Sequence, residues 1–262
     1  ILSSSNIITR AARMERLGLA GDTRLLAEAE FMLDYITRQN PNGFCSYVAD
    51  TYDYWAVLTN ILTIPKIKET IMARDGRLVI RPDSGDPLDI ICGTVGGEVY
   101  ETLEDAIEDV NDQHYTEAHE ACEGSHCMGM DEYETFVYIK GESTYYNLKT
   151  TFSYNRHDKT YYYIDNWGSD GKTTAEEVNP TAEMKGSIQL LWETFGGTVN
   201  EAGFKELDSH IGLIYGDSIT LERADSITRK LEAMGFASTN VVFGIGSYTY
   251  QCKDRKSTRL NS

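Results

Sequence analysis

The stretch "RLVIRPDSGDPLDIIC", residues 77–92, begins as a buried strand and stops being one within a single residue. Residues 78–80 form the short apolar run that is typical of a strand covered on both faces. Directly after this run come the cation of Arg81 and, beyond a proline, the carboxylate of Asp83. Charged side chains at the carboxyl end of a buried strand indicate a site in an α/β fold.

Three further segments repeat this pattern of an apolar strand that ends in Asp, Gly or Ser. They are "SYVAD" (46–50), "LIYGDS" (213–218) and "VVFGIGS" (241–247). Most of these strands lead into helical sequence, which predicts a parallel sheet covered by helices. A doubly wound sheet would fit, but a (β/α) barrel accommodates four equivalent convergent strand ends more naturally. The fold class that we predict is therefore α/β, with a barrel-like core.

The chain between these strands changes character, which predicts a division into domains. Residues 1–93 and 180–251 carry the strand and helix pattern, and we expect them to form the two parts of the barrel core. Residues 94–179 have an acidic first half and then Tyr-rich alternating runs, which predict an inserted, mostly antiparallel β segment. Residues 252–262 abruptly become basic and non-periodic, so we expect a non-native tail.

The insertion contains His114, His119, Cys122, His126 and Cys127, which are all residue types that bind zinc. No CxxC pair or standard finger spacing appears among them. We therefore expect a solvated acidic loop here and no metal site.

Composition limits the partners and the compartment. The net charge of −17 has no basic stripe to offset it, which argues against nucleic acid as a partner. No apolar run approaches the roughly 20 residues that would cross a bilayer. The five cysteines are unevenly spaced, and Cys45 and Cys92 lie in apolar stretches, as expected of a reduced, cytoplasmic protein. Because residue 1 is Ile and no signal peptide follows it, we expect a cut inside a longer protein.

Glycines and carboxylates at the strand ends indicate what the site binds. The turns at Gly216 and at residues 244–247 can present backbone N–H groups to a phosphate without any lysine, although glycines there could also simply turn a tight corner. Asp50, Asp83 and Asp217 would bind sugar hydroxyls, hold Mg²⁺ or orient a general base. The ligand that these groups predict is a phosphorylated sugar.

Arg81 adds a planar donor fork and a flat face for an aromatic ring, unless it simply pairs with Asp83. The sugar phosphate would then carry a planar base.

The segments "VIRPDSGDP", "HIGLIYGDSIT" and "VVFGIGSYTYQ", in this order, resemble the nicotinamide phosphoribosyltransferase family. The resemblance covers roughly residues 20–92 and 181–251. It implies a type II phosphoribosyltransferase fold, with an α/β barrel beside a β-rich domain. The implied reaction, in NAD biosynthesis, joins nicotinamide to phosphoribosyl pyrophosphate and yields nicotinamide mononucleotide and pyrophosphate. It also implies Mg²⁺ as cofactor, ATP as an optional coupling substrate, and a homodimer.

The resemblance assigns roles at the base end of the ligand. Arg81 resembles the arginine that contacts the nicotinamide carboxamide, and Asp83 the acid beneath it. Asp50 resembles the carboxylate that orients the family's catalytic His, and Ser46 a residue that lines the base pocket.

At the phosphate end, Gly216 and Asp217 match the family's ribose-binding pair. Gly246 and Ser247 match its phosphate loop, where Ser247 replaces a glycine of many members and adds a hydroxyl.

One departure leaves other functions open. The family's catalytic His lies in a Glu-His-Ser motif upstream of the helix that begins near Thr23, and this sequence contains no such motif. A nicotinate-using relative or another sugar-phosphate barrel enzyme is the first alternative. A non-catalytic ligand-binding homologue is the second.

Overall fold

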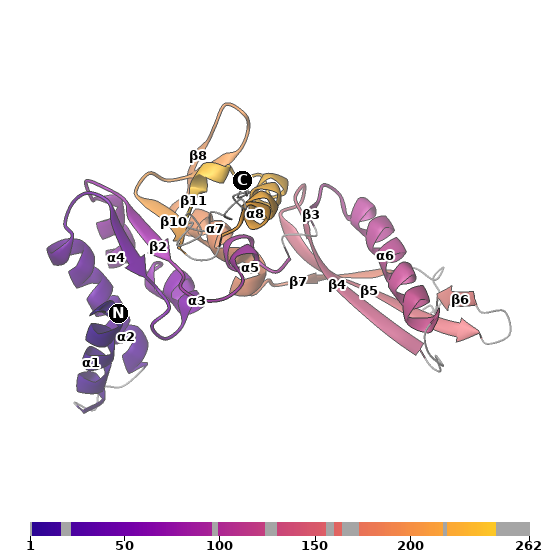
Figure 1. Ribbon diagram of the computed structural model, residues 1–262, viewed down its shortest axis with the longest axis horizontal. Helices are drawn as coiled ribbons and strands as arrows, with labels where there is room; N and C mark the ends of the chain where they lie inside the picture. The colour runs from indigo at the N-terminus through magenta and orange to yellow at the C-terminus, as the bar shows by residue number, and fades with distance from the viewer. Residues whose placement is uncertain are drawn as a thin grey trace, which may run out of the picture. The chain divides into compact units, whose positions relative to one another are not determined.

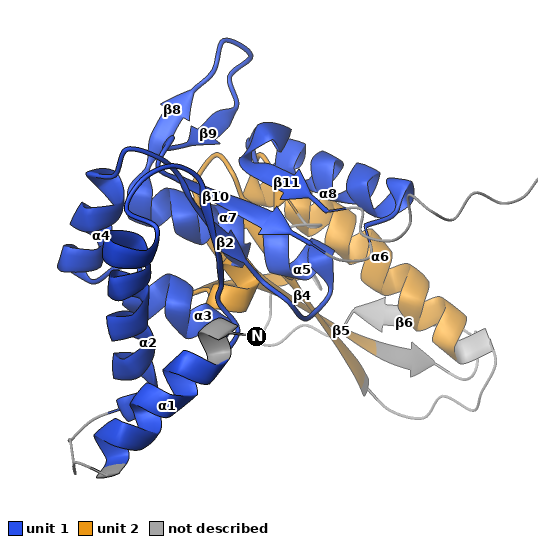
Figure 2. Ribbon diagram, turned by 60° about the vertical axis from the view of Figure 1, so that its left-hand side comes forward, with its two compact units in different colours: residues 1–93, 186–262 blue, residues 94–185 orange. Residues whose placement is uncertain are grey.

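The protein is described by a computed structural model, which covers residues 2–16, 22–95, 99–123, 130–155, 160–163, 173–216 and 219–244. The chain divides into two compact units, which Figure 2 shows in different colours. Unit 1 comprises residues 1–93 and 186–262, and unit 2 comprises residues 94–185.

Unit 1 is built on a four-stranded parallel sheet (Figure 1). Its strands, in sheet order, are β1 (Cys45–Val48), β2 (Leu78–Arg81), β10 (Ile211–Tyr215) and β11 (Val241–Phe243). The central strand β2 is the strand at the start of the quoted stretch, and its first three residues are buried. Because all pairings are parallel, the four carboxyl ends lie at one edge of the sheet.

Helices connect these strands, as predicted. The helical segments of unit 1 are α1 (Leu2–Arg16), α2 (Thr23–Asp34), η1 (Tyr35–Gln39), α3 (Tyr54–Ala56), η2 (Val57–Ile61), α4 (Pro65–Met72), α5 (Pro87–Cys92), α8 (Leu221–Ala233) and η3 (Ser238–Asn240), together with α7 (Ala182–Phe195) from Gly186 onward. Their ends follow local chemistry. The Asp22 carboxylate caps α2, Pro65 occupies the first turn of α4, and the Thr220 hydroxyl caps α8.

This mixed α/β architecture with a parallel sheet confirms the predicted fold class and is consistent with a type II phosphoribosyltransferase core. One element of unit 1 escaped prediction, the antiparallel hairpin of β8 (Gly197–Val199) and β9 (Lys205–Leu207). Strands of three residues are too short to show an alternating pattern, and all of β8 is exposed.

Unit 2 combines one long helix with a mostly antiparallel sheet. Its elements are β3 (Val99–Tyr100), α6 (Leu103–Glu123), β4 (Met130–Ile139), β5 (Thr144–Asn155), β6 (Thr160–Tyr163) and β7 (Thr174–Val178). The central strand β5 pairs antiparallel with β4, β6 and β7, while β3 pairs parallel with β4. The antiparallel pairing that the Tyr-rich runs predict is confirmed.

The prediction of a solvated acidic loop around His114 and His119 is wrong, because both residues lie in α6. Ala106, Val110, His114 and Ala118 recur at four-residue spacing and are buried. His126 and Cys127 lie outside the described residues. The abundance of acidic residues concealed this periodicity, although the acids simply occupy the exposed side of the helix.

His114 has a structural role in unit 2. Its two ring nitrogens hydrogen-bond the hydroxyls of Thr150 and Thr135, at 2.9 and 2.8 Å. Burial lowers the pKa of this imidazole, which favours the neutral ring.

The chain leaves and re-enters unit 1 at two glycines whose backbones touch. Gly93 and Gly186 both have positive φ, 84° and 76°. A methyl carbon on Gly186 would lie 2.2 Å from the Gly93 nitrogen, so no other residue fits there. Unit 1 therefore brings the two ends of its interrupted chain together by itself.

Candidate functional site at the carboxyl edge of the sheet

The predicted residues Asp50, Arg81, Asp83 and Gly216 all lie at the carboxyl edge of the unit 1 sheet. Asp50 follows β1, Arg81 ends β2, and Gly216 follows β10. The Asp50 carboxylate lies 3.5 Å from the Ser84 hydroxyl in the loop after β2. The expected proximity of the β2 and β10 strand ends is confirmed, because these two strands are neighbours in the sheet.

Arg81 lies against Gly216, and this contact explains the glycine. A methyl carbon on Gly216 would lie 2.9 Å from Cζ and Nη2 of Arg81. One on Gly244, after β11, would lie 2.8 Å from the Gly216 Cα. Two successive strand ends thus lack side chains, and the guanidinium fills the space beside them.

Arg81 is incompletely satisfied within the described part of the chain. Its Nη2 lies 3.3 Å from Oδ1 of Asp83 in an ion pair whose side chains are 38% and 55% exposed. Its Nε is buried and has no hydrogen-bond partner among the described residues. The ion pair that was the alternative for Arg81 therefore exists, but it leaves donors of the guanidinium for a ligand.

A tyrosine that the sequence reasoning missed anchors the loop carrying Asp83. The Tyr215 hydroxyl donates to the Gly85 carbonyl at 2.6 Å. Tyr215 directly precedes Gly216, so β10 holds both the arginine and the acidic loop in place. Only its position before the predicted glycine could have indicated this role.

The remaining predicted residues are less closely placed or lie outside the described residues. Ser46 is exposed in the edge strand β1, and its carbonyl accepts a hydrogen bond from Tyr35. Asp217, Gly246 and Ser247 lie outside the described residues, so their predicted ribose and phosphate contacts stay predictions.

A buried acid near Asp50 was also missed by the sequence reasoning. Glu28 of α2 is 1% exposed and accepts a hydrogen bond from the Tyr47 hydroxyl at 3.3 Å. The pKa of Glu28 is raised to about 7, chiefly by burial; the hydrogen bond from Tyr47 opposes this rise, and the negative charges of Asp50 and Asp53 add to it. The carboxyl side of β1 therefore holds a group that titrates near neutrality.

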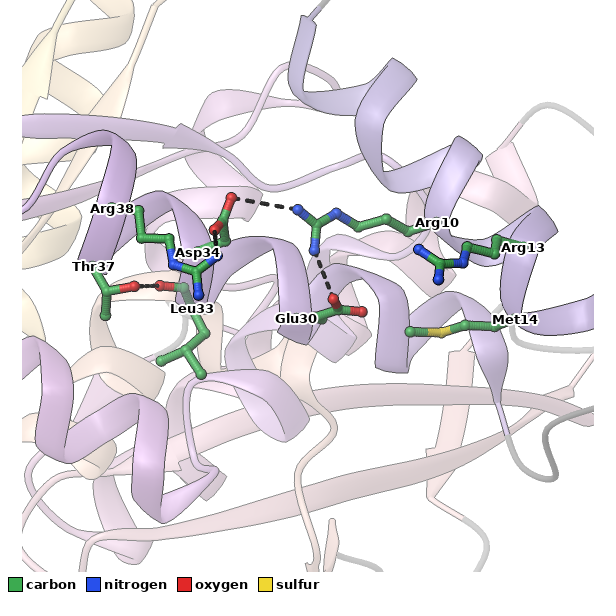
Figure 3. Close-up of a pocket in the computed structure, with 8 residues that line it drawn as sticks. All are labelled: Arg10, Arg13, Met14, Glu30, Leu33, Asp34, Thr37 and Arg38. Carbon is green, nitrogen blue, oxygen red and sulfur yellow. Dashed lines mark hydrogen bonds and ion pairs between the residues drawn. The ribbon is translucent and has the colours of Figure 1, made fainter. Parts of the chain in front are cut away.

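A cavity of unit 1 lies away from these residues. It has a volume of about 640 Å³ and lies between α1 and the segment formed by α2 and η1. Figure 3 shows the Arg10 guanidinium between Glu30 and Asp34, to which it is bonded at 2.9 and 3.4 Å. None of the predicted site residues lines this cavity, so we place the site at the carboxyl edge instead.

The described residues offer little support for a metal site built from protein side chains alone or for a cysteine nucleophile. No group of three His, Cys, Asp or Glu side chains is arranged there to hold a metal ion. Cys45 and Cys92 are buried free thiols, and burial raises the pKa of Cys92 to about 12. Such a thiol is a poor nucleophile. Within the same described ranges, no helix is long and apolar enough to span a membrane.

Comparison with known proteins shows which enzymes this chain is similar to. Residues 178–261 match the nicotinate phosphoribosyltransferase (NAPRTase) family. The chain is 33% identical to the nicotinamide phosphoribosyltransferase of Acinetobacter baylyi over 234 residues, 87% of this chain and 30% of that protein. Identity to the Mycoplasma pneumoniae enzyme of the same name is 30% over 220 residues, 84% of this chain and 31% of that protein.

A third relative is matched over a shorter part. The nicotinamide phosphoribosyltransferase of Xanthomonas campestris pv. campestris is 35% identical over 82 residues, 31% of this chain and 17% of that protein. The chain thus spans about a third or less of the curated relatives that it matches. Its similarity to nicotinamide phosphoribosyltransferases confirms the resemblance that its motifs carry.

Proposed function

We propose that this chain forms the base-binding part of a nicotinamide phosphoribosyltransferase, which makes nicotinamide mononucleotide and pyrophosphate for NAD biosynthesis. The observation that carries the proposal is the Arg81 guanidinium, which lies against Gly216 and pairs with Asp83. A planar donor with free N–H groups fits the carboxamide oxygen of nicotinamide, and its flat face fits the pyridine ring.

The charges at this edge favour nicotinamide over nicotinate. Asp83 already offsets the positive charge of Arg81, and Asp50 adds a further carboxylate beside Ser84. A neutral carboxamide can accept a hydrogen bond there without repulsion, whereas the carboxylate of nicotinate would face two like charges.

The oxygen donors present would also suit Mg²⁺. Asp83 and Asp50 are the carboxylates that could hold it, because Mg²⁺ in such enzymes binds one or two carboxylates together with substrate phosphates. The ion would neutralise the diphosphate of phosphoribosyl pyrophosphate. ATP as an optional coupling substrate, a homodimer and a cytoplasmic location belong to the same proposal, as does the absence of nucleic-acid and membrane partners.

Calorimetric titration with nicotinamide and, separately, phosphoribosyl pyrophosphate with Mg²⁺ tests the proposal. We expect Arg81→Ala to weaken nicotinamide about tenfold or more, because a charged hydrogen bond of about 1.5–3 kcal/mol is lost. Asp217→Ala should mainly weaken the sugar ligand. Arg77→Ala is the matched control, since Arg77 occupies the same position against Gly212 at the opposite edge and should not alter either affinity.

Two results would contradict the proposal. Equal losses for both ligands in both variants would mean that neither residue recognises a separate part of the substrate. Tighter binding of nicotinate than of nicotinamide would indicate that the chain belongs to a nicotinate-using enzyme instead.

A further inference from the structure

The loop after β2 contacts three strand ends of the sheet through three consecutive residues. The contacts, in chain order, are Asp83 with Arg81 of β2, Ser84 with Asp50 after β1, and Gly85 with Tyr215 of β10. Because these strands come from segments far apart in the chain, the sheet as a whole positions the loop. Loops that carry binding residues are commonly positioned by a rigid scaffold in this way.

The bond from Tyr215 is the shortest of the three contacts. Its hydroxyl donates to the Gly85 carbonyl at 2.6 Å, whereas the contacts of Ser84 and Asp83 measure 3.5 and 3.3 Å. Tyr215 is 5% exposed, so packing in the core fixes its side chain. Ser84 and Asp83 are exposed, and polar contacts of exposed side chains contribute little. Of the three contacts, the Tyr215 bond therefore restrains the loop most.

The acceptor of this bond lies where the loop backbone has the most freedom. Gly85 has a φ of 94°, a conformation that favours glycine, and glycine restricts the chain less than any other residue. On its carboxyl side the chain is already fixed, because Oδ1 of Asp86 accepts the Leu88 N–H at 2.8 Å as the cap of α5. On its amino side lies Asp83, so the bond from Tyr215 limits the movement of this carboxylate.

Tyr215 also borders a cleft next to the Arg81 guanidinium. The cleft has a volume of about 420 Å³ and is lined by residues 83–87, Tyr215 and Arg223. That volume is within the range of small-molecule sites. Asp83 belongs both to the wall of this cleft and to the ion pair with Arg81. The orientation of the loop therefore determines the shape of the cleft and the donors of Arg81 that a ligand can reach.

We propose that Tyr215 is a positioning residue for nicotinamide. Its hydroxyl, through the Gly85 carbonyl, holds Asp83 where this carboxylate pairs with one nitrogen of Arg81 and leaves other donors for the carboxamide. The inference rests on the proposed function. Phenylalanine at this position would pack in the same way but would release the loop, so the affinity for nicotinamide depends on a hydroxyl that acts through the loop.

Calorimetric titration of the 262-residue chain with nicotinamide tests this role. Tyr215→Phe removes only the hydroxyl and should weaken nicotinamide about tenfold. Tyr54→Phe is the matched control, because the Tyr54 hydroxyl is buried and bonds to the Ser187 hydroxyl at 2.7 Å, a contact that does not involve the loop. This variant should lower the urea midpoint about as much as Tyr215→Phe and leave the nicotinamide affinity unchanged.

Two further measurements distinguish positioning from a general loss of stability. Amide hydrogen exchange at residues 83–86 should become faster in Tyr215→Phe and stay unchanged in Tyr54→Phe. When Arg81→Ala is already present, Tyr215→Phe should cause little further loss of affinity, because the hydroxyl acts through the pair of Asp83 and Arg81.

The outcomes separate this inference from the proposed function. Unchanged nicotinamide affinity or loop exchange in Tyr215→Phe, an equal loss of affinity in Tyr54→Phe, or additive losses with Arg81→Ala would overturn the role of Tyr215. Nicotinamide binding by the unchanged chain would still support the function in each of these cases. Absence of nicotinamide binding by the unchanged chain would overturn the function and this inference together.

Discussion

Each edge of the unit 1 sheet has an arginine beside a glycine, but the two arginines differ in whether their Nε has a hydrogen-bond partner. At the amino edge, the Arg77 guanidinium lies near Gly212, and at the carboxyl edge the Arg81 guanidinium lies against Gly216. Both pairs join β2 to β10. Nε of Arg77 donates to the Ile211 carbonyl at 3.0 Å, whereas Nε of Arg81 has no partner among the described residues.

The aspartates near the two arginines also differ in how many partners they have. At the amino edge, Asp208 accepts two bonds from His210, one from its backbone N–H and one at its imidazole Nδ1. At the carboxyl edge, Asp83 shares a longer ion pair of 3.3 Å and is more than half exposed. Nε of Arg77 and the Asp208 carboxylate thus have partners within the protein, while Arg81 and Asp83 keep donors and acceptors for a ligand. An arginine beside a strand is therefore a binding residue only where its donors remain open.

The largest expected effect tests the structural role of the amino edge. Arg74 is 6% exposed and donates to the carbonyls of Ile36, Asn40 and Gly43. Arg74→Met should lower the free energy of unfolding by about 3–5 kcal/mol, because it removes a buried charged hydrogen bond to the Ile36 carbonyl and part-buried ones to Asn40 and Gly43. Urea denaturation followed by circular dichroism measures it.

Arg38→Met is the control for Arg74→Met. The Arg38 side chain is 84% exposed and, among the described residues, forms an ion pair only with Asp34, so its loss should change stability by about 0.5 kcal/mol or less. Similar losses in both variants would remove the distinction between buried structural arginines and exposed ones.

A smaller effect is the pH dependence of stability that the buried carboxyl group of Glu28 causes. Because the pKa of Glu28 is raised from 4.5 to about 7, the folded state binds its proton more tightly than the unfolded chain. Its contribution to stability is therefore full below about pH 4.5 and is lost as the pH rises through 7. The loss amounts to at most about 3 kcal/mol. Glu28→Gln should abolish it.

Urea midpoints of the unchanged chain and of Glu28→Gln at pH 5 and pH 8 provide the measurement. The variant should gain stability relative to the unchanged chain as the pH rises. Parallel pH profiles for the two proteins would show that Glu28 is not held in its protonated form.

The smallest expected effect compares the two glycines directly. Gly216→Ala should displace the Arg81 guanidinium and weaken nicotinamide about tenfold, with little change in stability. In Gly212→Ala the added carbon would lie 3.3 Å from Nε of Arg77, close but tolerable. This variant should keep its nicotinamide affinity, as measured by calorimetry. If Gly212→Ala lost affinity and Gly216→Ala did not, the site would lie at the amino edge of the sheet and our assignment would be wrong.

Local patterns predicted much of unit 1 because its strands are short, fully apolar runs with polar ends. The buried run at residues 78–80, the cap at Asp22 and the helix from Leu221 each depend on neighbours within a few positions. Parallel strands share one carboxyl edge, so the sequence predicted that Arg81 and Gly216 lie at the same edge, although not that their strands are neighbours.

The sequence-based prediction failed in α6, where the acidic composition concealed the four-residue spacing of the buried residues. In α6, acidic residues on the exposed side outweighed the buried series at Ala106, Val110, His114 and Ala118 in our interpretation. The information was in the sequence, since the four-residue spacing is visible there.

The sequence by itself determined which residues lie at the end of each strand, because a strand needs only a few consecutive side chains to be recognised. Only the tertiary structure decided that Arg81 fills the space beside Gly216, that Glu28 is buried near Asp50, and that Arg223 lines the cleft with Asp83. Such contacts depend on strand register and helix packing between segments up to 140 residues apart in the chain. No local pattern of side chains records that register, so it emerges only when the whole core packs.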